Sequence, residues 1–216
     1  MDQLFEALHF VFYNRYARKG AQMEAIVDPA SIQFQTKQGK QVYHHTAKMI
    51  PRAAKELQQN PIAYSLCQQA FAPYFSWMSS VIETHLPEEY EKLRKFAEVL
   101  PGNELAPAHP FAGFVINLNV ATALHRDWGD ESICVVTVVS DCEGGELVLL
   151  EPGLVLELRH GDTVIFPSSK ISHFNQHFNG MRSSIVCHSD KFSRTWVGAR
   201  NGWETTPTFR SSQPAV

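Results

Sequence analysis

The sequence lacks the features that mark secreted, membrane-spanning or zinc-ribbon proteins. No apolar run is long enough for a membrane span, and the opening Met-Asp-Gln-Leu-Phe-Glu has no basic, apolar leader. The four cysteines (Cys67, Cys134, Cys142 and Cys187) show no CxxC pairing, which favours buried free thiols in a reducing compartment over disulfides. We therefore expect an intracellular protein of the cytoplasm or nucleus, with no membrane partner.

The sequence also lacks an excess of either charge. It holds 19 basic and 22 acidic residues, a formal net charge of −3, so no global field draws the chain to nucleic acid. A nucleic-acid substrate would need a local basic patch. With 216 residues and 44% hydrophobic content, the chain can bury one sizeable core.

The N-terminal half has helical patterns. Residues 3–18 place apolar side chains at helical spacing, which predicts a first helix, and Gly39 marks a turn between short strands. Pro61 and Pro87 suit the first positions of two further helices, one over 61–85 and one that stops before Pro101. The apolar stripe on the first of these indicates core packing: Leu66, Ala70, Phe71, Phe75, Met78 and Val81.

From Phe111 the sequence pattern changes to short β-rich runs separated by Gly, Asp and Pro. Such runs without intervening helices predict an α+β chain with an antiparallel sandwich or jelly roll. We expect one domain over 1–204, with mainly helical support in 1–110, the β core in 111–190 and a loose tail in 205–216. The predicted strands are Gly113–Val120, Ser132–Ser140, Glu146–Leu150, Leu154–Arg159, Thr163–Pro167, Ile171–His177 and Ser183–His188.

A His-x-Asp tripeptide opens the candidate site. In an extended strand His125 and Asp127 project to the same face and can bind one metal ion. A second histidine completes a two-His-one-carboxylate triad, which leaves positions open for a cosubstrate and dioxygen. His173 suits this role, and His177, on the same predicted strand face, is the alternative ligand.

The chain carries a second copy of the tripeptide, His188-Ser189-Asp190. No histidine follows it, so it cannot complete the same order of ligands. Nine residues after His173 comes Arg182, with Ser184 two beyond it on the same strand face. A guanidinium binds a carboxylate bidentately and a hydroxyl adds a hydrogen bond, which suits the distal carboxylate of 2-oxoglutarate.

Together these motifs resemble the iron(II)/2-oxoglutarate dioxygenase superfamily, whose core is a double-stranded β-helix (jelly roll, cupin-like). The resemblance covers about residues 112–190. It rests on His125-x-Asp127, Gly144-Gly145-Glu146-Leu147, Gly161-Asp162, Ile165-Phe166-Pro167-Ser168, His173 and Gly180-x-Arg182-x-Ser184. More closely, Asn117-Leu118-Asn119 and Ile171-Ser172-His173-Phe174-Asn175 resemble the ten-eleven-translocation and J-binding-protein (TET/JBP) nucleobase oxygenases.

The resemblance implies an oxidoreductase with Fe(II), 2-oxoglutarate and dioxygen as cofactors, and N-terminal helices packed on one sheet. His125, Asp127 and His173 would hold the iron and Arg182 with Ser184 the 2-oxoglutarate. The implied reaction is oxidation of a C–H bond, with a methylated nucleobase in DNA or RNA as one substrate and a small metabolite or protein side chain as the alternative. A silent metal-binding scaffold is the third hypothesis, against which the complete ligand set argues. Oligomeric state stays open.

Other residues have two interpretations each. Asn117 and Asn119 share a predicted strand face that lines either the active site, where Asn117 would help bind 2-oxoglutarate, or solvent. Asn175 contacts the cosubstrate or only its own sheet, and Trp128 lines the substrate mouth or packs structurally. The C-terminal Arg194, Trp196, Arg200 and Trp203 interleave charge and aromatic rings, a pattern seen in nucleic-acid binders.

Overall fold

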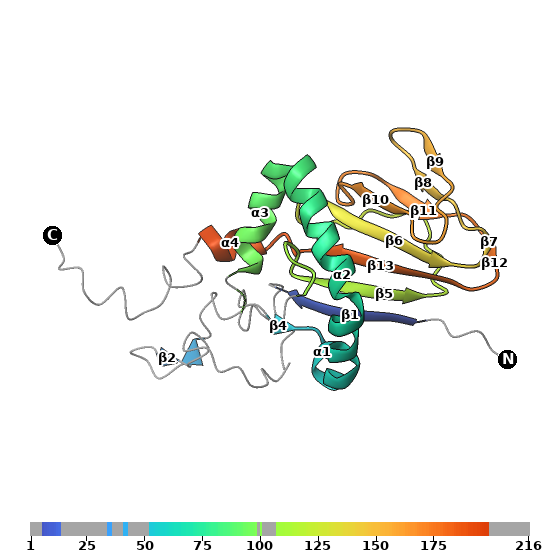
Figure 1. Ribbon diagram of the computed structural model, residues 1–216. Helices are drawn as coiled ribbons and strands as arrows, with labels where there is room; N and C mark the ends of the chain where they lie inside the picture. Colours follow the sequence, from blue (N-terminus) through green and yellow to red (C-terminus); the bar gives the residue numbers. More distant parts are fainter. Residues whose placement is uncertain are drawn as a thin grey trace.

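A six-stranded antiparallel sheet forms the centre of the molecule (Figure 1). The computed structural model describes residues 6–13, 34–35, 41–42, 52–98, 100 and 107–198. The strand order is β10-β6-β13-β5-β1-β4, beside a three-stranded sheet β11-β8-β9 and the pair β12-β7. Its strands are β1 (Glu6–Tyr13), β4 (Arg52–Ala53), β5 (Gly113–Leu118), β6 (Cys134–Ser140), β10 (Thr163–Phe166) and β13 (Arg182–His188).

The smaller sheets complete the jelly roll. They contain β8 (Leu147–Leu149), β9 (Leu154–Leu156) and β11 (His173–Asn175), with β7 (Glu143–Gly144) paired to β12 (Phe178–Asn179). The pair of β2 (Phe34–Gln35) and β3 (Gln41–Val42) is a separate two-stranded sheet. All seven strands predicted between residues 113 and 188 are present, most of them shorter by one or more residues, so this part of the prediction is confirmed. The fold is a double-stranded β-helix with helices on one sheet.

The prediction of a helix over 3–18 is wrong, because residues 6–13 form strand β1. This strand pairs antiparallel with β5, from Glu6 opposite Leu118 to Val11 opposite Gly113. Phe10 and Val11 are each 1% exposed although they point to opposite faces. A strand buried on both faces is apolar nearly throughout, and such a run cannot be told from a helix by periodicity alone.

The helices cover one face of the large sheet. They are α1 (Lys55–Gln59), α2 (Pro61–His85) and α3 (Pro87–Ala97), with the short α4 (Ser193–Gly198) after the last strand. The prediction of the two helices that begin at Pro61 and Pro87 is confirmed. Of the helices that the structure describes, none has the length and apolarity that a membrane span requires.

Aromatic packing fixes α2 on the sheet. The rings of Phe75 and Phe114 lie 5.1 Å apart, those of Tyr64 and Phe10 5.5 Å apart, and the Tyr74 hydroxyl lies 2.8 Å from Thr137 Oγ1 of β6. The buried positions are Tyr64, Phe75, Met78 and Ile82, so the stripe is rotated from the predicted one and Leu66 is exposed. Burial of each large side chain stabilises the fold by roughly 1.5–3 kcal/mol.

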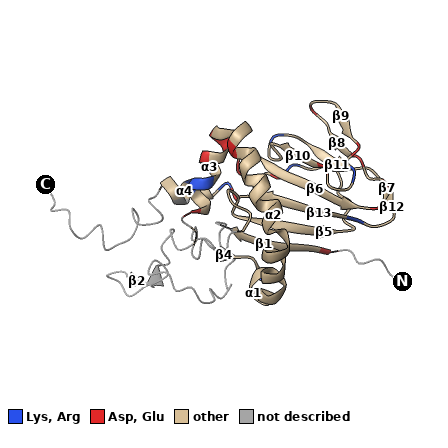
Figure 2. Cartoon of the chain, in the orientation of Figure 1, with Lys and Arg blue, Asp and Glu red and all other residues tan. Residues whose placement is uncertain are grey.

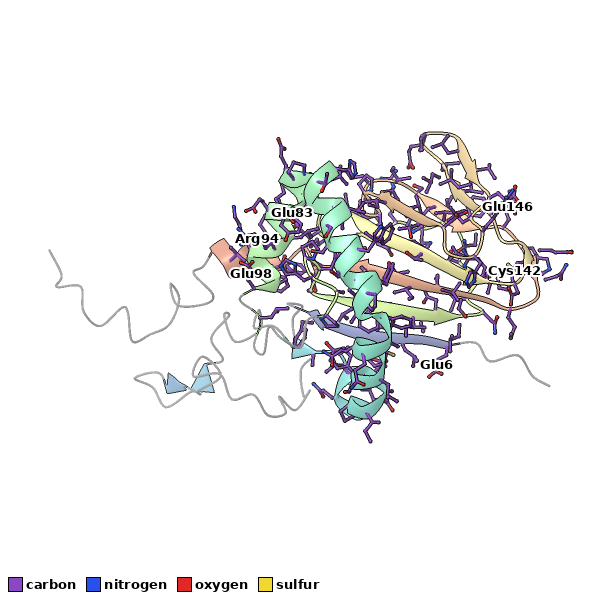
Figure 3. The ribbon with its side chains drawn as sticks, viewed as in Figure 1. Glu6, Glu83, Arg94, Glu98, Cys142 and Glu146 are labelled. Carbon is purple, nitrogen blue, oxygen red and sulfur yellow. The ribbon has the colours of Figure 1, made fainter. Side chains whose placement is uncertain are left out.

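Ion pairs stabilise the surface of α3. Arg94 binds Glu91 at 2.9 Å and Glu98 at 2.8 Å, one turn away on either side (Figure 3). Glu88 and Glu89 lie in the first turn, where the helix dipole favours negative charge. The helical layer is therefore a firm support for the sheet.

The opposite face of the sheet lines a pocket. Strand residues alternate between the two faces, so Ile185 and Cys187 of β13 pack toward α2 while Arg182, Ser184 and His188 line the pocket. The same alternation in β5 sends Phe114 to the helix side and Asn117 to the pocket side. The predicted common face of Arg182 and Ser184 is confirmed.

Candidate metal and cosubstrate site

His125 and His173 lie opposite each other on neighbouring extended segments. They form an isolated antiparallel bridge, with backbone N–O distances of 3.0 and 2.9 Å in the two directions, and their rings are 4.3 Å apart. His173 begins β11, whereas His125 follows β5 in a segment with no regular strand. The bridge therefore joins two histidines that are far apart in the sequence.

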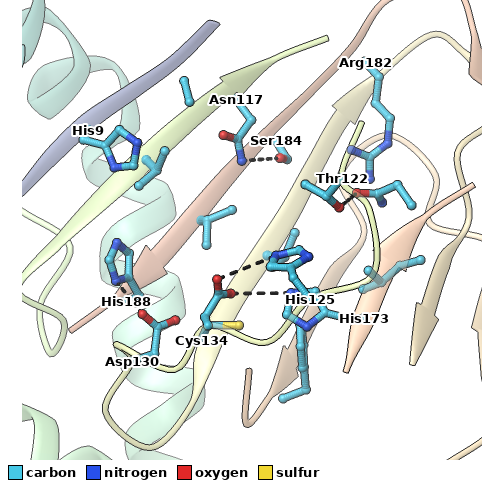
Figure 4. A pocket seen from close by; sticks show the side chains of 18 residues that line it. His9, Asn117, Thr122, His125, Asp130, Cys134, His173, Arg182, Ser184 and His188 are labelled. Atoms are coloured by element: carbon cyan, nitrogen blue, oxygen red, sulfur yellow. Dashed lines mark hydrogen bonds and ion pairs between the residues drawn. The ribbon is translucent and has the colours of Figure 1, made fainter. Parts of the chain in front are cut away.

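The Asp127 carboxylate faces both imidazoles, and its two ion pairs with the labelled His125 and His173 are the dashed lines in Figure 4. Its carboxylate oxygens are 3.6 Å from His125 Nε2 and 3.4 Å from His173 Nε2. One donor atom from each of the three residues lies within 4.8 Å of the others, which forms the one potential metal cluster among the described residues. Two imidazoles and a carboxylate on one side of a cavity fit a divalent iron with open positions.

The rings of both histidines are oriented in the same way. Nδ1 of His125 lies 2.7 Å from the carbonyl of Ala123, and Nδ1 of His173 lies 3.0 Å from the carbonyl of Ile171. A carbonyl can only accept, so Nδ1 carries the proton and Nε2 presents its lone pair to the cavity. This second shell fixes the tautomer that a metal requires.

The charges within the triad also suit a cation. Burial raises the pKa of Asp127, but the hydrogen bond and charge of His173 and the charge of His125 outweigh it, and the net pKa is lowered. Burial lowers the pKa of His173, but the Asp127 carboxylate and the Ile171 carbonyl outweigh that effect and raise it. Asp127 is thus held in the ionised form that binds metal.

Glu151 joins the two segments that carry the ligands. Its carboxylate accepts hydrogen bonds from Ser172 N at 2.6 Å and Ser172 Oγ at 2.7 Å, and it also pairs with the guanidinium of Arg126. Ser172 precedes His173 and Arg126 lies between the other two ligands. The hydrogen bonds from Ser172 and from Arg126 lower the pKa of Glu151 to about 2. Sequence patterns gave no signal for this residue.

Arg182 is buried in the same pocket, at 5% exposure. Gly145, at φ 79°, makes room for it, since a Cβ there would lie 3.1 Å from Arg182 Cδ and 3.2 Å from Nε. Burial lowers the pKa of Arg182, and none of the described carboxylates forms an ion pair with it. A buried cation of this kind favours an anionic ligand.

Three asparagine side chains form hydrogen bonds in this pocket or with the backbone of Arg182. Asn117 Nδ2 donates to Ser184 Oγ at 3.4 Å, and Asn175 Oδ1 accepts from Thr122 Oγ1 at 3.0 Å, all within the pocket lining. Asn119 Oδ1 accepts from the backbone N of Arg182 at 3.0 Å. The prediction that Asn119 shares a face with Asn117 is wrong, because Asn119 has φ 54°, a left-handed turn that ends the strand alternation.

The pocket has a volume of about 320 Å³, near the lower limit of ligand sites. His9 of β1, Asp130 and His188 line it opposite Arg182 (Figure 4). His9 and Asp130 were missed at the level of sequence, and His188 was considered only as part of the second His-x-Asp tripeptide. His188 Nδ1 lies 3.1 Å from Asp130 Oδ1, and Ser168 Oγ donates to the other oxygen at 2.8 Å. The position of Asp130, three residues after Asp127, was the available signal.

Other predicted residues lie away from this pocket. His177 is exposed and lies outside both the pocket lining and the metal cluster, and Trp128 is 64% exposed on a neighbouring groove. His125 has the extended geometry of a β-bridge, and Asp127, which lies in no regular strand, donates its N–H to the Ser168 carbonyl at 3.1 Å just before the turn at Trp128 and Gly129. The Gly39 turn, the side chain of Trp196, Arg200, Trp203 and the tail from 205 lie outside the described residues.

Comparisons with solved structures show the fold. NgTET1 in complex with 5mC DNA matches with a TM-score of 0.55 and 15% identity over 68% of this chain and 58% of that chain. A 2OG-Fe(II) oxygenase family oxidoreductase from Burkholderia pseudomallei matches with TM-score 0.32 and 25% identity, over 36% and 42%. An RmlC-like cupin protein from Desulfovibrio desulfuricans matches with TM-score 0.27 and 18% identity, over 35% and 71%.

The family comparison is more specific. The profile of Tet_JBP, the oxygenase domain of the 2OGFeDO superfamily, matches residues 39–191, more than half of the chain. No curated protein matches. The chain spans 58% of the length of NgTET1. The predicted enzyme class and its cofactors, Fe(II), 2-oxoglutarate and dioxygen, are thereby confirmed. The chain belongs to the Tet_JBP family, the oxygenase domain of the 2OGFeDO superfamily.

Proposed function

We propose that His125, Asp127 and His173 bind the iron of this dioxygenase. The observation that carries the proposal is the convergence of their donor atoms within 4.8 Å at the wall of a pocket. The backbone carbonyls behind the two imidazoles aim Nε2 of each ring at the cavity, and the lowered pKa of Asp127 keeps its carboxylate ionised. When bound, iron with 2-oxoglutarate and dioxygen supplies the oxidation of a substrate C–H bond.

Arg182 is the anchor for 2-oxoglutarate in this proposal. Its guanidinium is buried in the pocket that His125, Asp127 and His173 also line, so it would bind a carboxylate of 2-oxoglutarate there. Ser184 and Asn117, opposite each other on β13 and β5, supply further polar atoms, and Asn175 faces the same cavity. These residues orient the cosubstrate, and the apolar wall of Val115, Val136 and Val186 excludes water.

We further propose that the substrate is a methylated nucleobase in DNA or RNA. The family match and the similarity in fold to NgTET1, which was solved with 5mC DNA, support this substrate class. The wall formed by His9, Asp130 and His188 offers imidazole and carboxylate groups that can hydrogen-bond the polar edge of a base. A pocket of about 320 Å³ admits a single base, which must leave its stack.

The cofactor assignment is tested without substrate. Anaerobic addition of Fe(II) and 2-oxoglutarate should give the weak visible charge-transfer band of a chelated 2-oxo acid. Asp127→Ala should abolish the band, and Arg182→Ala should raise the 2-oxoglutarate concentration that is needed for it. A normal band in Asp127→Ala would overturn the ligand assignment.

The substrate assignment needs a separate measurement. The enzyme is incubated in air with oligonucleotides that carry a methylated pyrimidine, and the bases are analysed by mass spectrometry. We expect oxidised methyl groups together with succinate. Succinate formation stimulated instead by a metabolite pool or a peptide, with the bases unchanged, would reject a nucleobase and favour the alternative substrates.

A further inference from the structure

A second hollow adjoins the candidate active site. This groove has a volume of about 770 Å³ and shares Asp130 with the pocket that His125, Asp127 and His173 line. Its wall comes from α3, the loop that follows Asp127, the β10–β11 turn, and the segment from β13 into α4. Asp130, three residues after the proposed ligand Asp127, thus lines both cavities.

Cations from separate elements line this groove. They are Lys92 and Lys95 of α3, Lys170 of the β10–β11 turn, Lys191 after β13, and Arg194 of α4. Figure 2 shows basic positions in blue where α3 and α4 lie side by side. Lys92 pairs with Glu89 at 2.9 Å and Arg194 with Glu131 at 2.6 Å. Among the described residues, no carboxylate forms an ion pair with Lys95, Lys170 or Lys191, and all three are exposed. Glu89, Asp130 and Glu131 also line the groove, and one Lys191 N–H is used by a backbone carbonyl, but these three cations keep donors that can bind an anion.

Trp128 provides an aromatic surface at the same place. Its side chain is 64% exposed, and it directly follows the proposed ligand Asp127. Lys191 holds the local backbone, because its Nζ donates to the Trp128 carbonyl at 2.5 Å and its N–H to the Gly129 carbonyl at 2.8 Å. The guanidinium of Arg126 lies 5.3 Å from the indole centre. An exposed indole on a fixed loop, beside cations, is suited to stacking with a base.

We propose that this groove binds the nucleic-acid strand that flanks the target base. The phosphates would lie along Lys95, Lys170 and Lys191, and a base next to the target would stack on Trp128. The proposal rests on the proposed function and extends it, because it names the surface outside the pocket that holds the strand. With a net charge of −3, the chain has no general attraction for nucleic acid, so binding must come from a local surface of this kind.

Salt dependence of oligonucleotide binding tests the groove. Fluorescence anisotropy is followed with labelled single-stranded DNA and RNA at increasing NaCl. Three phosphate contacts predict a slope of about −2 for log K against log salt, which means about 20-fold weaker binding between about 50 and about 200 mM. Lys170→Gln/Lys191→Gln should reduce the slope by about 1.4. Trp128→Ala should weaken binding by about fivefold or more, and Trp128→Phe should restore most of it.

Lys55→Gln/Arg159→Gln is the matched control, since it removes the same charge from exposed residues outside the groove. Its salt slope should equal that of the wild type. Equal slopes for the two double variants would overturn the proposal, as would the absence of oligonucleotide binding at low salt. Binding to anionic phosphatidylserine vesicles but not to oligonucleotides would overturn it in favour of a lipid surface.

The proposal about the substrate and the proposal about the groove can be rejected independently. Asp127→Ala should bind oligonucleotide as the wild type does, because the groove residues do not depend on the metal ligand. Salt-dependent binding that is lost in the groove variants, without oxidation of any methyl group, would reject the nucleobase as substrate and leave the groove supported. Methyl oxidation with unchanged binding in those variants would reject the groove alone.

Discussion

The two His-x-Asp tripeptides of this chain have the same pattern and lie in different surroundings. His125 and Asp127 both face the pocket, with Nε2 and Oδ1 3.6 Å apart. In the second copy only His188 lines the pocket, where it pairs with Asp130, while Asp190 is 1% exposed and accepts a hydrogen bond from Phe192 N at 3.0 Å. One copy forms a cavity wall and the other ends a strand.

The difference comes from what lies opposite each copy. The first copy forms a backbone bridge to His173, which brings the second imidazole to 3.4 Å from Asp127. Beside the second copy, Asp130 forms the corresponding backbone bridge to Asp190, and the Ser189 hydroxyl accepts from Ala112 N at 2.9 Å. A tripeptide therefore becomes a metal site only where the fold supplies a third donor.

Replacing each of the two aspartates by alanine is the strongest test of this contrast, and the larger effect on activity is expected at Asp127. Asp127→Ala should lower dioxygenase activity by more than about 100-fold, since loss of a direct ligand exceeds the 10- to 100-fold effects of outer partners. The measurement is 2-oxoglutarate turnover to succinate with saturating Fe(II). The fold should remain, because Asp127 is partly exposed and packs in no core cluster.

Asp190→Ala should behave in the opposite way. Loss of a buried acceptor predicts a decrease of about 1–3 kcal/mol in the free energy of unfolding, measured in urea. The charge-transfer band with Fe(II) and 2-oxoglutarate should persist at temperatures where the variant is folded. If Asp190→Ala lost the band while Asp127→Ala kept it, the contrast between the two copies would be reversed.

Arg182 lines the same pocket as the first copy and is the proposed anchor for 2-oxoglutarate. Arg182→Lys keeps the charge but loses the planar fork, so we expect the KM for 2-oxoglutarate to rise by about 30-fold, from roughly 2 kcal/mol of lost carboxylate binding. Fe(II) binding without 2-oxoglutarate should be unchanged. Steady-state kinetics over a range of 2-oxoglutarate concentrations measure the effect, and an unchanged KM would remove Arg182 from the anchor.

Sequence order and strand alternation predicted a large part of this arrangement. His125, Asp127 and His173 converge, and Arg182 and Ser184 share a face, because alternation along β13 follows directly from the period of two. The strand β1 was predicted as a helix, since burial on both faces removes the alternation that marks a strand. His9 was missed together with it.

Other parts of the site depend on contacts that no local pattern encodes. Glu151 reaches Ser172 and Arg126 across 21 and 25 residues. The left-handed turn at Asn119 moves that amide out of the predicted face and toward the Arg182 backbone. The Glu151 bonds follow from the pairing of β8 with β11 and the Asn119 bond from the pairing of β5 with β13, so they become visible only once the strands are paired.

Glu151→Gln should weaken iron binding by the first copy while its proposed ligand residues stay unchanged. We expect Fe(II) affinity to fall by about tenfold, at the lower end of the effects of outer partners, because Ser172 and Arg126 lose their common carboxylate. Competitive titration with a chelator measures it. The matched control is Glu157→Gln, an exposed carboxylate 75% accessible that lies outside the pocket lining, and it should leave the affinity unchanged.

The same carboxylate predicts a pH dependence. The pKa of Glu151 is lowered from 4.5 to about 2, so its stabilising contribution is complete above about pH 4.5 and is lost as the pH falls toward 2. The difference in free energy of unfolding between the wild type and Glu151→Gln should therefore be constant at neutral pH and shrink over that acidic range. A difference that grew on acidification would contradict the assigned partners.

The smallest effect is expected at His177, which the sequence offers as the alternative third ligand. Its side chain is exposed and faces away from the pocket lining, while only its backbone carbonyl has a structural role, accepting from Gly145 N at 3.0 Å. His177→Gln keeps that backbone bond, so Fe(II) affinity and turnover should stay within about twofold of the wild type, as for most surface substitutions. Loss of the charge-transfer band in His177→Gln, with the band kept in a His173→Gln protein, would move the third ligand to His177 and separate it from the His125 bridge.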